Sequence, residues 1–258
     1  MKPGKLLAGV ITVVMLAGCA SSAERKHEKE QAARAAASYT ELGIEYFRQG
    51  NYDLSLTKLE RALELDSEYA QAHGAIAVLY EKVGDTKRAE KHYKKGLRLR
   101  PDDAGSQNNY GQFLCFQGRY KDAHEEFMKA AGNPFYATPA VPLTNAGLCA
   151  KRVPDAMLAE QYFREALEKD PKFAPALLQM AIMKFESGRF LSARAYLERF
   201  QQVAEHNPES LWLAVRTESA LRDHNSSGRY AILLRTTFPK SEQAVMLLEW
   251  ENERQTGR

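Results

Sequence analysis

Cysteine is scarce in this chain, and the motifs of several enzyme classes are missing. Three cysteines are too few for a disulfide framework, and the lack of a Cys-x-x-Cys pair argues against a zinc ribbon or a thiol redox site. No phosphate-binding loop, no His-Glu-x-x-His and no Gly-x-Ser-x-Gly occurs. The six histidines are scattered, without a ligand-like partner at helical spacing. We therefore expect no enzyme activity, no metal, no cofactor and no small-molecule substrate.

Positive and negative residues are nearly balanced in number. The chain of 258 residues has 36 Lys and Arg against 33 Asp and Glu, a formal net charge of +3, and 44% of its residues are apolar. This composition is that of a globular protein and excludes a wholly disordered chain. No basic stripe is evident in the sequence, so nucleic acid is not expected as a partner.

The N-terminus has an apolar run that is too short to cross a bilayer. Residues 6–17 are apolar and follow two lysines, whereas a membrane span needs roughly 20 such residues. The pattern is that of a secretory signal. The string Leu16-Ala17-Gly18-Cys19 resembles the lipobox of bacterial lipoproteins, which implies a signal peptide over residues 1–18 and acyl chains, palmitate among them, on Cys19. Ala20, where an Asp would favour retention at the inner membrane, implies the periplasmic face of the outer membrane.

Residues 19–35 are interpreted as the lipidated N-terminus and its tether. They interleave charges of both signs and have no apolar face. As a flexible coil they span on the order of 25 Å, and a partly helical tether is the alternative. A plain signal peptide, in which Cys19 is incidental, is the alternative to the lipoprotein.

The rest of the chain, residues 36–258, is internally repetitive. Similar residues recur at steps of 34 or 36 residues, a period typical of helical repeat proteins. The columns are a first small residue (Gly43, Ala77, Gly111, Gly147, Ala181), a turn residue (Gly50, Gly84, Gly118, Pro154, Gly188), a second small residue (Ser55, Ala89, Ala123, Ala159, Ala193) and a large apolar residue (Leu59, Tyr93, Phe127, Phe163, Leu197).

These columns predict two amphipathic helices in each unit. The small residues let the two helix backbones approach, and a turn glycine can supply a left-handed helix cap. The large residue is expected to fill the space between units. The unit resembles the tetratricopeptide repeat. We expect an all-α, right-handed superhelix with a sixth, degenerate repeat, a C-terminal capping helix and a non-helical, proline-rich connection over residues 132–142. The five clear repeats are expected at about 36–69, 70–103, 104–139, 140–173 and 174–207.

Cys115 and Cys149 fall on the first helices of adjacent repeats, which are expected to pack side by side. In an oxidising periplasm they could form a disulfide across the proline-rich connection. The alternative is two buried free thiols that act as small hydrophobes.

The inner face of the repeats is the expected working surface. In such repeats it is built mainly from fixed positions of the first helices, and apolar residues there are mixed with charge and amides. This mixture fits a groove for an extended or helical protein segment. A tight superhelix, or the capping helix covering the same residues, is the alternative. The expected groove residues are Ile44, Phe47, Val78, Asn108, Asn109, Gln112, Phe116 and Leu148.

Several longer strings are more specific than the repeat columns. Residues 108–115 (Asn-Asn-Tyr-Gly-x-Phe-Leu-Cys), residues 145–150 (Asn-Ala-Gly-Leu-Cys-Ala) and residues 211–216 (Leu-Trp-Leu-Ala-Val-Arg) are similar to the PilF/PilW family of type IV pilus biogenesis lipoproteins. Two departures, Pro154 for a turn glycine and Ser67 for a helix-closing proline, lie outside these strings. The similarity runs from the lipobox to Phe238.

The resemblance implies a pilotin, a lipoprotein that binds monomers of the pilus secretin and helps them reach the outer membrane and multimerise. It also implies a link to pilus stability and twitching motility. The segment of secretin is then expected to contact Ile44, Phe47, Val78, Asn108, Asn109 and Phe116. The alternative function is a periplasmic scaffold or regulator that recruits peptidoglycan enzymes to the outer membrane.

Overall fold

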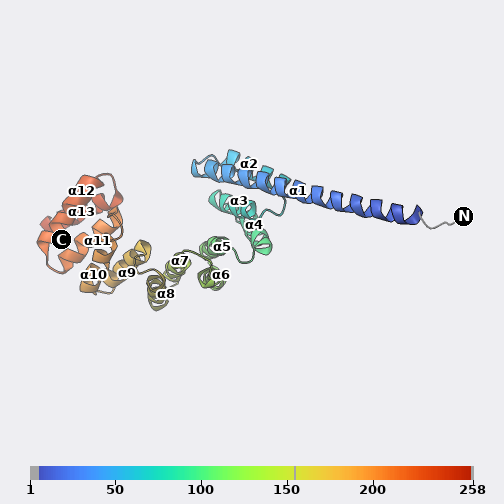
Figure 1. Ribbon diagram of the computed structural model, residues 1–258. Helices are drawn as coiled ribbons and strands as arrows, with labels where there is room; N and C mark the ends of the chain where they lie inside the picture. The colour runs from blue at the N-terminus through green and yellow to red at the C-terminus, as the bar shows by residue number, and fades with distance from the viewer. Residues whose placement is uncertain (1–5, 154, 257–258) are drawn as a thin grey trace. The chain divides into compact units, whose positions relative to one another are not determined.

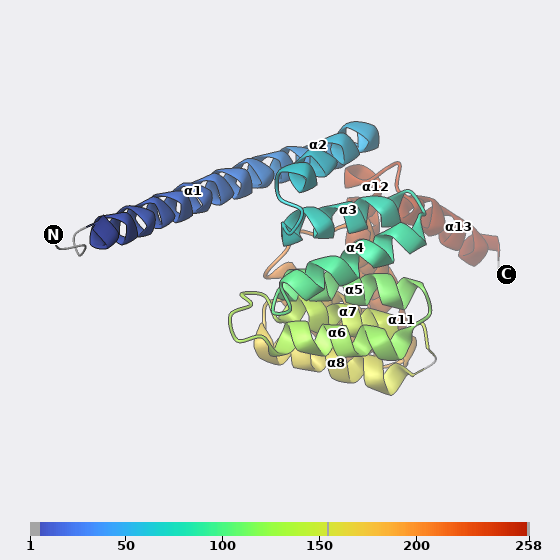
Figure 2. The same ribbon diagram turned by 90° about the vertical axis from the view of Figure 1, so that its right-hand side faces the viewer.

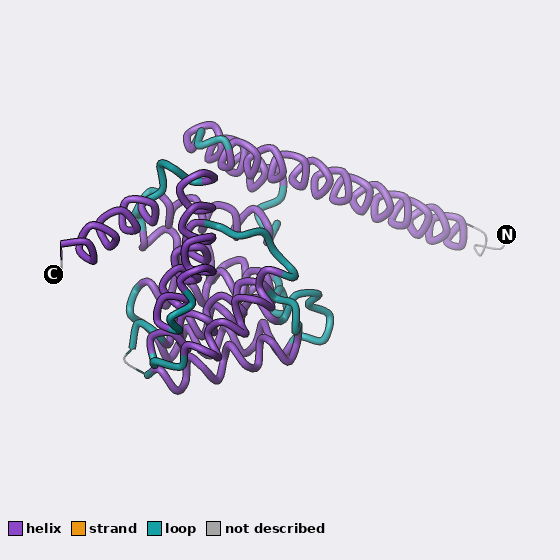
Figure 3. The backbone as a smooth tube through the Cα atoms, turned by 90° about the vertical axis from the view of Figure 1, so that its left-hand side faces the viewer, coloured by secondary structure: helices purple, strands orange, loops and turns teal. Residues whose placement is uncertain are grey.

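The computed structural model describes residues 6–153 and 155–256, which form thirteen helices and no strand (Figures 1 and 3). Short turns separate the helices. In chain order they are α1 (Leu6–Arg48), α2 (Tyr52–Leu65), α3 (Ala70–Lys82), α4 (Thr86–Leu99), α5 (Ala104–Phe116), α6 (Tyr120–Gly132), α7 (Ala140–Ala150), α8 (Ala156–Lys169), α9 (Ala174–Glu186), α10 (Phe190–Gln201), α11 (Pro208–Ala220), α12 (His224–Thr237) and α13 (Glu242–Thr256).

The helices form two compact units, which divide within α5 after Phe113. In the N-terminal unit α1 packs against α2 and α3 against α4, and Figure 2 shows the second of these pairs side by side. In the C-terminal unit the pairs are α7 with α8, α9 with α10 and α11 with α12, and α13 packs on the last pair. The predicted all-α fold of paired helices is confirmed, including the sixth repeat and the capping helix.

Helix α1 is much longer than a repeat helix and projects past α2 (Figure 1). It includes residues 19–35, the expected tether, which are helical throughout. The side chain of Cys19 lies outside the part of the chain that the structure describes. Among the described residues, no helix combines the length and the apolarity that a membrane span requires.

The predicted columns form the contact between the two helices of a repeat. The expectation that the large residues lie between units is therefore wrong for Leu59 and Phe163, which lie on the first helix of their own repeat. The second small residues and the large apolar residues are buried in every clear repeat. A Cβ atom added to Gly43 would lie 2.6 Å from Leu59 Cγ, and one added to Gly147 would lie 2.5 Å from Phe163 Cε1. The absence of a side chain therefore lets the large residue of the second helix rest directly on the backbone of the first.

The turns between the paired helices follow the glycine column. Gly50, Gly84, Gly118 and Gly188 have φ of 79°, 83°, 75° and 72°, the left-handed conformation that glycine adopts without strain. Pro154, the predicted turn residue of the fourth repeat, lies outside the described residues. Arg222 takes the same place in the sixth repeat with φ of 62°, so this turn keeps its geometry without the glycine that would have marked it in the sequence.

The proline-rich connection is shorter than predicted. Helix α6 ends at Gly132 and α7 begins at Ala140, so the expected non-helical segment over residues 132–142 is wrong at its C-terminal end. Pro142 is buried in the first turn of α7. A proline is compatible with that turn because its missing N–H would have no intrahelical partner there.

A disulfide joins Cys115 of α5 to Cys149 of α7, with a Cα–Cα distance of 5.9 Å. Both cysteines belong to the C-terminal unit. The bridge closes a loop of 34 residues that contains α6 and the proline-rich connection, which restricts the unfolded chain and so favours the folded one.

Two histidines lie in the contact between α3 and α4. The Nδ1 atoms of His73 and His92 are 3.0 Å apart, and His73 Nε2 lies 3.2 Å from the carbonyl oxygen of Ser67. The carbonyl can only accept, so His73 donates from Nε2 and accepts at Nδ1 from His92. Burial lowers the pKa of both rings, that of His92 to about 4 with help from the charge of His73 and nearby cations.

Substitution of Gly147 tests the close approach of the helices. We expect Gly147→Ala to lower the free energy of unfolding by about 1–3 kcal/mol, because the added Cβ meets a fully buried ring that cannot move aside. Gly228→Ala is the matched control, since nothing lies within 4 Å of its added Cβ in α12; it should leave stability unchanged or raise it. Urea denaturation of the three proteins measures this, and equal midpoints for Gly147→Ala and wild type would contradict the packing.

The histidine pair predicts a loss of stability in acid. Because the folded-state pKa of His92 lies below its unfolded value, the unfolded chain binds more protons below about pH 6.5. The thermal midpoint should therefore fall between pH 7 and pH 5, and it should fall less in His92→Gln. His224→Gln, at an exposed histidine of α12, is the control. If His92→Gln loses as much stability over this pH range as wild type does, the pair makes no contribution.

Candidate functional site

A cavity of about 440 Å³ lies in the N-terminal unit. Its walls come from three first helices, with Ile44 and Phe47 on α1, Val78 on α3 and Asn109 on α5. The three apolar side chains are half-buried, and Phe47 is held by the ring of Tyr52, 5.6 Å away between centroids. Four of the predicted groove residues therefore line one cavity.

Small residues create the hollow between these walls. Gly74 and Ala75 of α3 and Gly105 of α5 line the cavity where larger side chains would occupy it. A Cβ added to Gly74 would meet only Ser106 Oγ, at 3.5 Å, which is an ordinary contact. Gly74 is therefore not required by packing or by backbone conformation, and its effect is to leave the space open.

Polar groups surround the apolar walls. Arg48 of α1 and Gln71 of α3 are exposed at the cavity and carry hydrogen-bond donors. Asp103 supplies a carboxylate, and its two oxygens accept hydrogen bonds from the backbone N–H and the hydroxyl of Ser106. A site with apolar walls and convergent polar groups can bury side chains of a protein segment and fix its register.

Glu81 of α3 is an acidic residue of a first helix that lies outside the cavity. Glu81 of α3 accepts a hydrogen bond of 2.7 Å from the hydroxyl of Tyr93. Burial raises the pKa of Glu81, and this hydrogen bond partly opposes the rise. Its carboxylate is engaged with α4 and does not line the cavity.

The other predicted groove residues lie elsewhere. Asn108 is only 5% exposed and does not line the cavity, because the neighbouring position on α5 is the one that turns toward it. Gln112 is half-buried and is also absent from the lining. Phe116 and Leu148 are exposed residues of the C-terminal unit, where the guanidinium of Arg152 lies 4.4 Å from the centre of the Phe116 ring.

The sequence interpretation missed the lining residues that have small or short side chains. Gly74 and Gly105 occupy other positions of the inner-face set to which Val78 belongs, so the repeat register could have found them. They were overlooked because glycine has no side chain that could contact a ligand. In the part of the chain that the structure describes, no group of three His, Cys, Asp or Glu residues is placed to hold a metal ion.

Comparison with known proteins defines the class of this fold. Two family models of the tetratricopeptide repeat match, over residues 34–102 and 92–125. Together with the helix pairs and their buried columns, these matches make the chain a tetratricopeptide-repeat protein.

Within that class the similarity is to pilus proteins. The type IV pilus assembly protein PilF of Pseudomonas aeruginosa is 29% identical over 233 residues, which cover 90% of this chain and 92% of the relative. The solved structure of Pseudomonas aeruginosa PilF matches with a TM-score of 0.73 and 28% identity over 86% of this chain and 99% of its own. The crystal structure of PilW, described as a widely conserved type IV pilus biogenesis factor, matches with a TM-score of 0.72 and 29% identity over 83% and 98%. The chain is a PilF/PilW-like tetratricopeptide-repeat protein.

Proposed function

We propose that this protein is an outer-membrane lipoprotein that acts as a pilotin in type IV pilus biogenesis. It binds a segment of the pilus secretin and promotes the localisation and multimerisation of the secretin in the outer membrane. The observation that carries the proposal is the cavity lined by Ile44, Phe47, Val78 and Asn109 in a chain similar to PilF and PilW along most of its length.

The chemistry of the cavity suits a peptide segment. A groove with apolar anchors takes alternate side chains of an extended chain or one face of a helix. The polar groups of Arg48, Gln71, Asp103 and Asn109 can pair with backbone or side-chain atoms of that segment. Binding a monomer in this way keeps a membrane-protein segment shielded until assembly.

The N-terminus supports the anchoring part of the proposal. The string Leu16-Ala17-Gly18-Cys19 resembles a lipobox, and two or more acyl chains are enough for stable anchoring, at roughly 0.8 kcal/mol for each buried CH₂. A chain held at the periplasmic face of the outer membrane would meet secretin monomers where they assemble.

Filling the cavity tests the role of this surface. Gly74→Leu places a bulky side chain into the hollow without removing a core residue. Loss of one such anchoring pocket should weaken binding of the secretin about 10-fold or more, and heat-resistant secretin multimers in the outer membrane should fall accordingly. The matched control is Gly228→Leu in α12, where an added Cβ meets nothing within 4 Å.

Two further observations would contradict the pilotin proposal. The first is a normal level of heat-resistant multimers in cells that lack the gene. The second is co-purification with peptidoglycan synthases instead of secretin, which mass spectrometry of the solubilised membranes distinguishes. Normal multimers with Gly74→Leu alone would remove the cavity from the mechanism.

Substitution of the lipobox cysteine tests the anchor. Cys19→Ser removes the thiol that receives the acyl chain, so incorporation of radiolabelled palmitate into the protein should be abolished. The doubly substituted Cys115→Ser/Cys149→Ser should remain labelled, because these residues are joined in a disulfide. Labelling of Cys19→Ser at the wild-type level would rule out lipidation at this position.

A further inference from the structure

Helix α4 concentrates positive charge to a degree that the other second helices of the repeats do not. From Asp85 to Arg100 there are seven Lys and Arg residues and two Asp and Glu residues, a net charge of +5 in a chain whose total is +3. Helices α2, α6 and α8 each have one more acidic than basic residue. The expectation that the chain has no basic stripe is therefore wrong for α4.

The cations of α4 are aligned on one face. Lys87, Lys91, Lys94 and Arg98 follow at steps of four, three and four residues, and all four are exposed. This spacing keeps them on one side of the helix over about 16 Å. We call these four residues the cationic stripe. The opposite side of α4 contributes Ala89, Tyr93 and Gly96 to the core.

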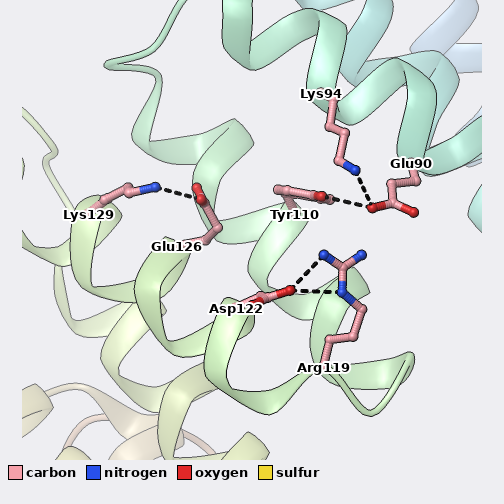
Figure 4. Close-up of polar contacts among 7 residues, drawn as sticks. All are labelled: Glu90, Lys94, Tyr110, Arg119, Asp122, Glu126 and Lys129. Carbon is pink, nitrogen blue, oxygen red and sulfur yellow. Dashed lines mark hydrogen bonds and ion pairs between the residues drawn. The ribbon is translucent and has the colours of Figure 1, made fainter.

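Most of the cationic stripe has no acidic partner. Lys94 Nζ lies 2.7 Å from Glu90 Oε1, which also accepts a hydrogen bond from the hydroxyl of Tyr110 (Figure 4). For Lys87, Lys91 and Arg98 the structure shows no ion pair within the described residues. Lys129 of α6 differs in this respect, since it pairs with Glu126 at 2.7 Å (Figure 4).

The stripe has no apolar anchor. No large hydrophobic side chain is exposed between Thr86 and Leu99, although exposed ones occur on other helices. Protein interfaces draw most of their affinity from buried aromatic, aliphatic or arginine anchors. A row of cations alone fits a surface that presents many negative charges, and anionic lipid headgroups attract such a row.

Such a surface is within reach of α4 if the chain is lipidated. Helix α1, which contains Cys19, belongs to the same compact unit as α4. From Cys19 to Ala36, the first buried residue among the α1 side chains that the structure describes, the helix rises about 25 Å. Anchoring at Cys19 makes contact between the stripe and the bilayer intramolecular, so that weak attractions suffice.

We propose that the cationic stripe of α4 binds the anionic phosphate headgroups of the bilayer to which Cys19 anchors the chain. The contact holds the N-terminal unit against the membrane and so sets the orientation of the cavity relative to the bilayer. The proposal rests on the lipid anchoring proposed above and not on the identity of the protein partner.

A lysine footprint on the lipidated full-length protein tests the contact. The protein is reconstituted into vesicles of phosphatidylcholine, with or without about 30% phosphatidylglycerol, and acetylated with a lysine-reactive ester. Mass spectrometry should show Lys87, Lys91 and Lys94 acetylated several-fold more slowly in the anionic vesicles. About 1 M salt should remove the difference because it screens exposed charges. Lys121 of α6, which is also exposed, should react at the same rate in both vesicles.

A variant and a competing polyanion complete the test. In Lys87→Gln/Lys91→Gln the protection of Lys94 should decline, since two of the four attractions are gone. Equal acetylation of the stripe in neutral and anionic vesicles would overturn the proposal. So would protection by poly-glutamate in neutral vesicles without protection by anionic lipid, which would indicate an acidic protein partner. Failure of the wild-type protein to float with vesicles would contradict the anchoring itself.

Discussion

The close contact between the two helices of each repeat is the constraint on which the rest of the structure depends. Phe163 lies on the backbone of α7 at Gly147, and Leu59 lies on α1 at Gly43. A repeat of this size cannot bury its apolar faces alone, so each pair gains its stability from this contact and from its neighbours. Because the contact recurs at a fixed register, it places equivalent positions of successive first helices on one surface.

The candidate site is a consequence of that register. Ile44, Phe47 and Val78 are carried by α1 and α3 at the positions that face away from the paired helix, and they therefore meet across a hollow. Gly74 and Gly105 widen it because they add no side chain. The second helices of the N-terminal unit bury one face in the core. Their exposed faces can vary in charge without disturbing that core. The cationic stripe of α4 occurs on such a face.

Sequence reasoning was effective wherever a residue type determines packing. The buried columns located the helix pairs, and the inner-face positions located Ile44, Phe47 and Val78. It failed where a local rule was broken. Arg222 has a left-handed backbone conformation although it is not glycine, and Pro142 is helical because it lies in the first turn of α7. It also failed where the outcome depends on helix azimuth, since Asn108 is buried while Asn109 lines the cavity. The alignment of the α4 lysines on one face can be recognised only when the position of that helix is known.

We propose that the inner face of the N-terminal unit receives the secretin. Site-specific photocrosslinking in living cells tests it most directly, with a photoreactive amino acid at Val78 in the cavity and, as a control, at Val245, an exposed residue of α13 that is 52% accessible. We expect a secretin adduct from position 78 and none from position 245. An adduct from position 245 alone, or no secretin adduct from either position, would contradict it.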